Sequence, residues 1–212
     1  MQPSPFAYGL TAGLILTRQE TIGFMKKIPA SGASNVTPRP HPFQFPTVWK
    51  HAKPENLRRS QFTGGRYGHS GDPERTVDIA QRALYDALGL EVFNLHPYNV
   101  DIVPMPHDYQ REQGMRITPI WAMQVVNVDG PGVKTLKEAC TAKRAQAGKA
   151  PHALAPSISF LDKSQFAEIA ETAHLPISTH ARNYLDVLYE HLKQGRILPT
   201  VAFSIPQDAA IA

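Results

Sequence analysis

The chain has 212 residues, a net charge of +4, 42% hydrophobic residues and 19% charged residues. This composition is that of a folded globular protein and excludes fibrous and intrinsically disordered classes, while the length allows one substantial core or two small ones. A single cysteine, Cys140, excludes an internal disulfide and a cysteine-rich zinc site.

The N-terminal segment predicts neither a transmembrane helix nor a secretory signal. Its longest apolar stretch, residues 10–16, is shorter than the roughly 20 residues that a membrane-spanning helix needs. A secretory signal has a basic region before its apolar run, whereas the first basic residue here, Arg18, follows that run. We therefore expect a cytoplasmic protein.

Basic residues gather in two segments of the chain. Residues 26–75 hold nine basic and three acidic residues, and residues 132–150 hold five basic residues and one acidic residue. The remainder is net acidic. Such a distribution favours an anionic partner such as nucleic acid, although a solvated loop and a solvated helix face can have the same composition.

The first elements in chain order are a strand and a long irregular arm. Residues 7–17 are rich in Leu and Ile, and we expect a strand in the second half of this stretch. Residues 29–73 contain many prolines and the pair Gly64-Gly65, which interrupt regular structure. An irregular segment of this length is uncommon inside a compact domain unless it is functional or disordered.

A helix, two strands and a second helix are predicted next. The run Asp72-Pro73-Glu74 favours a helix start, and Gly89 favours its end. Apolar residues recur between them at helical spacing: Val77, Ala80, Leu84 and Leu88. Residues 92–104 and 115–128 are rich in β-branched and aromatic residues, which predicts an antiparallel pair of strands, and residues 133–147 predict a helix.

The C-terminal part predicts a strand followed by two helices. Ser157-Ile158-Ser159-Phe160 alternates polar and apolar residues, as a strand with one buried face does. Asp162 is a suitable cap for the first helix and Ser178 for the second, which ends at Gly195. The two apolar stripes are Phe166, Ile169, Ala170 and Ala173, and then Ala181, Leu185, Leu188 and Leu192.

The run 157–192 resembles the ribbon-helix-helix family of DNA-binding proteins. Its parts ISFLD, FAEIAETA and LPISTHARNYLDVLYEHL are similar to the strand, first helix and second helix of regulators and relaxosome accessory proteins of plasmids and integrative elements. In that family the strands of two chains pair into a ribbon that enters the major groove, and the N-terminus of the second helix holds a phosphate. The resemblance therefore implies a homodimer on double-stranded DNA.

Carried over to this sequence, the resemblance assigns DNA contacts to five residues. Ser157 and Ser159 would face the bases, whereas Ser178, Thr179 and His180 would meet the backbone. A helical hairpin that only packs or dimerises would have the same apolar pattern.

The arm offers a second group of DNA-binding candidates. Its basic residues alternate with aromatic residues, a mixture suited to phosphate neutralisation and base stacking, and equally to a protein interface. The basic candidates are Lys50, Lys53, Arg58, Arg59 and Arg66.

Motifs for catalysis and cofactor binding are not found in the sequence. It has no P-loop, nucleophile elbow or dinucleotide-binding pattern, and its histidines lack the spacing of metal ligands. We expect no cofactor and no metal, and we lean against an enzyme, although a site assembled from distant residues has no such signature.

Together these patterns predict an α+β protein in three parts. Residues 1–148 would hold antiparallel strands, helices and the basic proline-rich arm (29–73), residues 157–195 a ribbon-helix-helix-like unit, and residues 196–212 a C-terminal tail. The expected function is DNA binding, in transcriptional regulation or as a relaxosome accessory factor of a mobile genetic element. The alternative is a structural or assembly protein, of a virion or of a conjugation apparatus, whose arm contacts neighbouring subunits.

Overall fold

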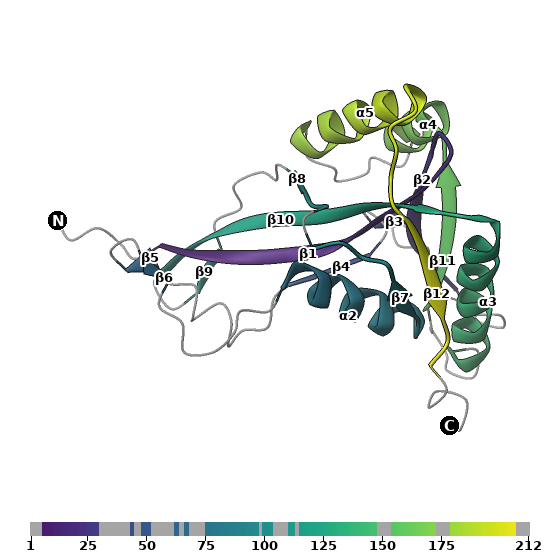
Figure 1. The fold of residues 1–212 in the computed structure, drawn as a ribbon, viewed down its shortest axis with the longest axis horizontal. Helices are drawn as coiled ribbons and strands as arrows, with labels where there is room; N and C mark the ends of the chain where they lie inside the picture. The colour runs from purple at the N-terminus through teal and green to yellow at the C-terminus, as the bar shows by residue number, and fades with distance from the viewer. Residues whose placement is uncertain are drawn as a thin grey trace.

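A computed structural model provides the structure of the chain (Figure 1). It describes residues 6–29, 43–44, 48–51, 62–63, 66–67, 75–97, 99–103, 110–112, 115–147, 154–172 and 179–206. The arm candidates Lys53, Arg58 and Arg59, and the cap candidate Ser178, lie outside the described residues.

The described residues form a mixed α+β fold built on one large sheet, which confirms the predicted α+β class. Six strands form its main path, in the order β11 (Leu154–Leu161), β2 (Thr21–Pro29), β1 (Phe6–Arg18), β10 (Met115–Val128), β12 (Thr200–Ser204) and β7 (Glu91–Phe93). Four shorter strands add to it: β3 (Phe43–Gln44) on β2, β4 (Val48–His51) on β1, and β8 (Asp101–Val103) and β9 (Gln110–Glu112) on β10. A separate hairpin pairs β5 (Phe62–Thr63) with β6 (Arg66–Tyr67).

The centre of the sheet is the parallel pair of β1 and β10, which runs from Phe6↔Arg116 to Thr17↔Asn127. Residues 12–17 of β1 and 121–126 of β10 are buried, and their side chains lie on both faces of the sheet. Leu14 and Leu16 of β1 face one core, whereas Ile15 between them faces the other. A strand that is covered on both sides needs a continuous apolar run instead of alternation, and the run Leu14–Leu16 provides it.

Helices cover both faces of this sheet. The first core joins the sheet to α2 (Thr76–Leu88) and α3 (Gly130–Ala147), and the second joins it to α4 (Lys163–Thr172) and α5 (Thr179–Lys193). In Figure 1, α4 and α5 lie on the opposite side of the long strands from α2, and α3 lies beside β11 and β12. The chain therefore folds into three layers, with the sheet in the middle.

Several predicted helix ends are confirmed. Gly89, after α2, has a φ of 68° and its N–H donates to the Tyr85 carbonyl. Asp162 Oδ1 accepts the Gln165 N–H at 2.9 Å and caps α4. Gly195, after α5, has a φ of 79°, the left-handed conformation that glycine adopts without steric cost. The start of α2 differs from the prediction, because the cap position is Arg75, which pairs through its side chain with Asp78.

The expectation that residues 92–104 and 115–128 form one antiparallel pair was only partly right. Residues 101–103 form β8 and pair antiparallel with β10, but residues 91–93 form β7 and pair with β12. The long partner of β10 is β1, more than 100 residues earlier in the chain. Composition and turn signals report local pairing, and they carry no information about a partner so far away.

The C-terminal segment contains the predicted strand and two helices, but the structure does not show a ribbon-helix-helix unit. β11 pairs antiparallel with β2 of its own chain from Leu154↔Pro29 to Leu161↔Ile22. α3 also packs against β11, where Cys140 and Ile158 both border the core of α2 and α3. One edge of β11 is therefore used by β2, and α3 contacts the strand as well, whereas a ribbon requires that this strand pair with a second chain.

The same packing removes the reason for expecting a homodimer through residues 157–192. A second chain is not needed to cover the apolar faces of these two helices. Phe166, Leu185 and Leu188 are instead buried in the core that α4 and α5 share with the sheet.

The division of the chain into residues 1–148, 157–195 and 196–212 stays a prediction, although strands from all three parts lie in one sheet. Two described pieces of the proline-rich arm also belong to this sheet. β3 pairs with β2 and β4 pairs with β1, so residues 43–44 and 48–51 contact their own chain.

Candidate nucleic-acid interface

The two serines predicted to read bases are half-buried in β11. Ile158 and Phe160, which alternate with them, pack against the core of α2 and α3, whereas Leu161 packs against the core of α4 and α5. Side chains alternate along a strand, so Ser157 and Ser159 share the face of Leu161. They therefore lie on the sheet face that carries α4 and α5, and not on a projecting ribbon.

The other predicted DNA contacts fall on different elements. Thr179 and His180 begin α5, Lys50 lies in β4 opposite Ala12, and Arg66 lies in β6 opposite Thr63. The structure thus places the described candidates on β11, α5, β4 and β6.

A different element, α3, combines basic charge with an exposed face. Its start is well defined, because Asp129 Oδ1 accepts the Gly132 N–H at 2.7 Å and the Asp129 carbonyl accepts the Val133 N–H. Gly132 allows the helix to pass close to β10, since a Cβ at this position would lie 2.7 Å from Val128 Cγ1. These contacts fix how α3 leaves the sheet.

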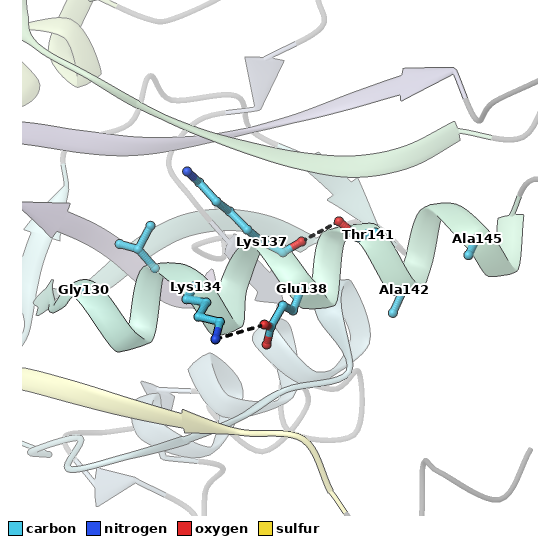
Figure 2. Close-up of a pocket in the computed structure, with 8 residues that line it drawn as sticks. Gly130, Lys134, Lys137, Glu138, Thr141, Ala142 and Ala145 are labelled. Carbon is cyan, nitrogen blue, oxygen red and sulfur yellow. Dashed lines mark hydrogen bonds and ion pairs between the residues drawn. The ribbon is translucent and has the colours of Figure 1, made fainter.

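The inner and outer faces of α3 have different chemistry. Val133, Leu136 and Ala139 are buried against the sheet. The outer side borders a shallow hollow of about 670 Å³ (Figure 2). Its lining residues are Val133, at the border of the buried face, and Gly130, Lys134, Lys137, Glu138, Thr141, Ala142 and Ala145.

The four basic residues of α3 have different surroundings. Lys134 and Lys137 are exposed, and Lys134 lies 3.9 Å from Glu138 in a solvent-exposed ion pair. Lys143 is half-buried beside Gly89 at the C-terminal end of α2, where a positive charge is favourable. Arg144 is also half-buried, and its charge favours a lower pKa for the Cys140 thiol. Burial of the thiol is the larger influence and raises this pKa. Only Lys134 and Lys137 of these four thus face the solvent fully.

Charge separates α3 from the helices on the other face of the sheet. α3 has four basic residues and one acidic residue, a net +3. α4 has one basic and two acidic residues, and α5 has two of each. The sequence had already indicated the basic segment 132–150, but without a motif there was no reason to assign individual contacts to it.

A second recess, of about 600 Å³, lies beside α5, and three of its polar side chains bind one another. Asp101 accepts two hydrogen bonds from Arg196, both of 3.1 Å, and a third from the Tyr184 hydroxyl at 2.9 Å. Burial, and then the nearby Asp101 charge, raise the pKa of Tyr184 above its ordinary value. This arrangement ties α5 to β8 and occupies the Asp101 carboxylate.

Among the described residues, no group of three or more His, Cys, Asp or Glu side chains lies close enough to hold a metal ion. In the same parts of the chain, no helix combines the length and hydropathy that crossing a membrane requires.

Comparison with known proteins gives no family. No protein-family model matches the chain, and no curated protein matches it. One solved structure similar to it is the solution structure of the E. coli ORF135 protein, with 10% sequence identity over 92% of this chain and 97% of that chain. The TM-score of 0.37 is too low to establish a shared fold.

Proposed function

We propose that the protein binds double-stranded DNA. The observation that carries this proposal is the net +3 charge of α3, which lies against the sheet with its lysine-bearing side exposed. The phosphate backbone dominates the affinity of proteins for DNA, and exposed lysines are the side chains that neutralise it. The two helices on the other face of the sheet have no such excess of positive charge.

The proposal stops at DNA binding. A role as a transcriptional regulator or relaxosome accessory factor depends on the ribbon-helix-helix resemblance, and the pairing of β11 with β2 gives that resemblance no support. The assembly role depends on an arm that contacts other subunits, and the described pieces β3 and β4 pair instead with strands of the same chain.

Binding of a fluorescently labelled duplex, followed by anisotropy, tests the function. We expect saturable binding at about 50 mM salt that weakens steeply by about 200 mM, because each neutralised phosphate releases counterions. A parallel titration with an uncharged polymer of similar size controls for non-specific adhesion of the label. Absence of binding at the lower salt concentration, or affinity that does not change with salt, would contradict the proposal.

A further inference from the structure

The outer face of α3 has the arrangement needed to contact the two edges of a DNA groove. In Figure 2, the Lys137 ammonium group lies on one side of the helix, and Lys134 lies with Glu138 on the other. Beyond them, toward the C-terminal end of α3, the hollow is lined by small side chains, Thr141, Ala142 and Ala145. Small residues allow a partner to approach the helix closely, while the lysines on either side can reach separate phosphates.

We propose that duplex DNA binds along this outer face of α3, with Lys134 and Lys137 on phosphates at opposite edges of one groove. This inference rests on the proposed function and adds the surface and the mode of contact. The occupant follows from charge complementarity, since α3 carries the largest positive excess of the described helices and DNA is a dense polyanion.

The one acidic group on this face does not block such binding. Glu138 pairs with Lys134 at 3.9 Å, and the two side chains are 57% and 78% exposed. Ion pairs of this exposure are weak because water screens them, so Lys134 can exchange Glu138 for a phosphate. Lys143 is half-buried beside the end of α2, and the inference therefore gives it no DNA contact.

The proposed mode of contact is independent of DNA sequence. Lysine contacts with phosphate set the position of a protein on DNA but do not distinguish bases. Thr141 donates its hydroxyl to the Lys137 carbonyl, and Ala142 and Ala145 have no polar side-chain groups for hydrogen bonds with base edges. Duplexes that differ in sequence but not in length should therefore bind with similar affinity.

The test compares charge-matched variants on the two faces of the sheet. Two phosphate contacts account for a loss of affinity of about tenfold between 50 and 200 mM salt. The double variant Lys134→Ala and Lys137→Ala should lose most of this part of the salt dependence. The control, Arg182→Ala with Lys193→Ala, removes the same charge from exposed positions of α5 and should leave binding nearly unchanged. Thermal unfolding of each variant shows that its fold is intact.

A gain of affinity gives an independent measurement. Glu138→Lys adds positive charge beside Lys134 and should tighten binding several-fold, whereas Glu171→Lys adds the same charge on α4 and should not.

The possible outcomes distinguish DNA binding in general from DNA binding through α3. If the unchanged protein fails to bind duplex DNA, the proposed function itself is wrong. If it binds, but the α3 and α5 pairs weaken binding equally, or Glu138→Lys and Glu171→Lys strengthen it equally, the protein binds DNA through another surface and the α3 inference is overturned. Strong preference for one sequence would overturn the proposed mode of contact.

Discussion

Asp101 of β8 and Arg196, the residue after Gly195 at the end of α5, form a two-bond ion pair in which both N–O distances are 3.1 Å. The Tyr184 hydroxyl donates to the same carboxylate at 2.9 Å. One carboxylate thus joins a short strand, a helix and the segment that leads to β12. The side chains of Asp101 and Arg196 are only 24% and 27% exposed, so the pair is partly shielded from water.

Asp101→Ala should lower the free energy of unfolding by about 1–3 kcal/mol, because it leaves the Tyr184 hydroxyl and the Arg196 guanidinium without their partner. Urea unfolding measures this change. Asp78→Ala is the matched control, since the Arg75–Asp78 pair has the same two-bond form but lies in solvent. Equal losses in both variants would show that shielding of the Asp101–Arg196 pair from water contributes nothing to the free energy of unfolding.

Two buried polar residues of the central strands should respond in opposite ways to apolar substitution. The Gln124 side chain is fully buried, and neither its nitrogen nor its oxygen has a hydrogen-bond partner among the residues that the structure describes. Thr17 is also buried, but its hydroxyl donates to the Val126 carbonyl at 3.0 Å. We expect Gln124→Met to raise the free energy of unfolding by about 1 kcal/mol and Thr17→Val to lower it by a similar amount.

Urea denaturation of the two variants beside the unchanged protein checks these signs. A loss of stability in Gln124→Met would mean that the amide makes a favourable interaction in solution, for example with a buried water molecule.

Local signals in the sequence predicted the helices well. Asp162, Gly89 and Gly195 are caps whose effect depends on neighbouring backbone groups only, and all three occur at helix ends. The apolar stripe of α5 was also right for Leu185, Leu188 and Leu192, which are buried. The predicted stripe omitted Tyr189, which is also buried. Its burial is possible because its hydroxyl donates to the Leu161 carbonyl, which satisfies the polar end of the ring.

Long-range pairing was not predictable in the same way. The register of β1 with β10, or of β11 with β2, joins segments whose compositions fit many partners. For this reason the strand at residues 157–160 was expected to pair with the same strand of a second chain. The basic residues of α3 were visible as a segment of charge, but the exposure of Lys134 and Lys137 and the burial of Val133 depend on how the helix sits on the sheet.

Phe166→Ala should show that the C-terminal helices are stabilised within one chain. Phe166 is 2% exposed and stacks on Phe24 of β2, with ring centroids 5.3 Å apart. Loss of this ring should lower the free energy of unfolding by about 3–5 kcal/mol, as aromatic truncations in a core do. Because the partner ring is in the same chain, we expect the thermal midpoint of both proteins to be independent of protein concentration. A midpoint that rises with concentration would indicate that a second chain covers this face.

The stability of the protein should fall at alkaline pH, because burial raises the pKa of the Cys140 thiol and of the Tyr184 and Tyr189 hydroxyls. Each group is an acid that holds its proton more tightly in the folded chain than in the unfolded chain. Its contribution is complete below the unfolded pKa, about 8.5 for Cys and about 10 for Tyr, and is lost as the pH rises toward the folded pKa. We therefore expect the free energy of unfolding to decrease between about pH 8.5 and 11.

Tyr189→Phe tests one of these contributions directly. The variant loses the 3.0 Å hydrogen bond to the Leu161 carbonyl, so it should be less stable than the unchanged protein at pH 7. Above about pH 10, however, its stability should decrease less steeply, because it no longer has a hydroxyl whose ionisation favours the unfolded chain. Tyr85→Phe is the matched control, since the Tyr85 side chain is 47% exposed. Urea unfolding at a series of pH values measures the slopes, and equal slopes in Tyr189→Phe and the unchanged protein would show that the buried hydroxyl of Tyr189 is not a source of the alkaline destabilisation.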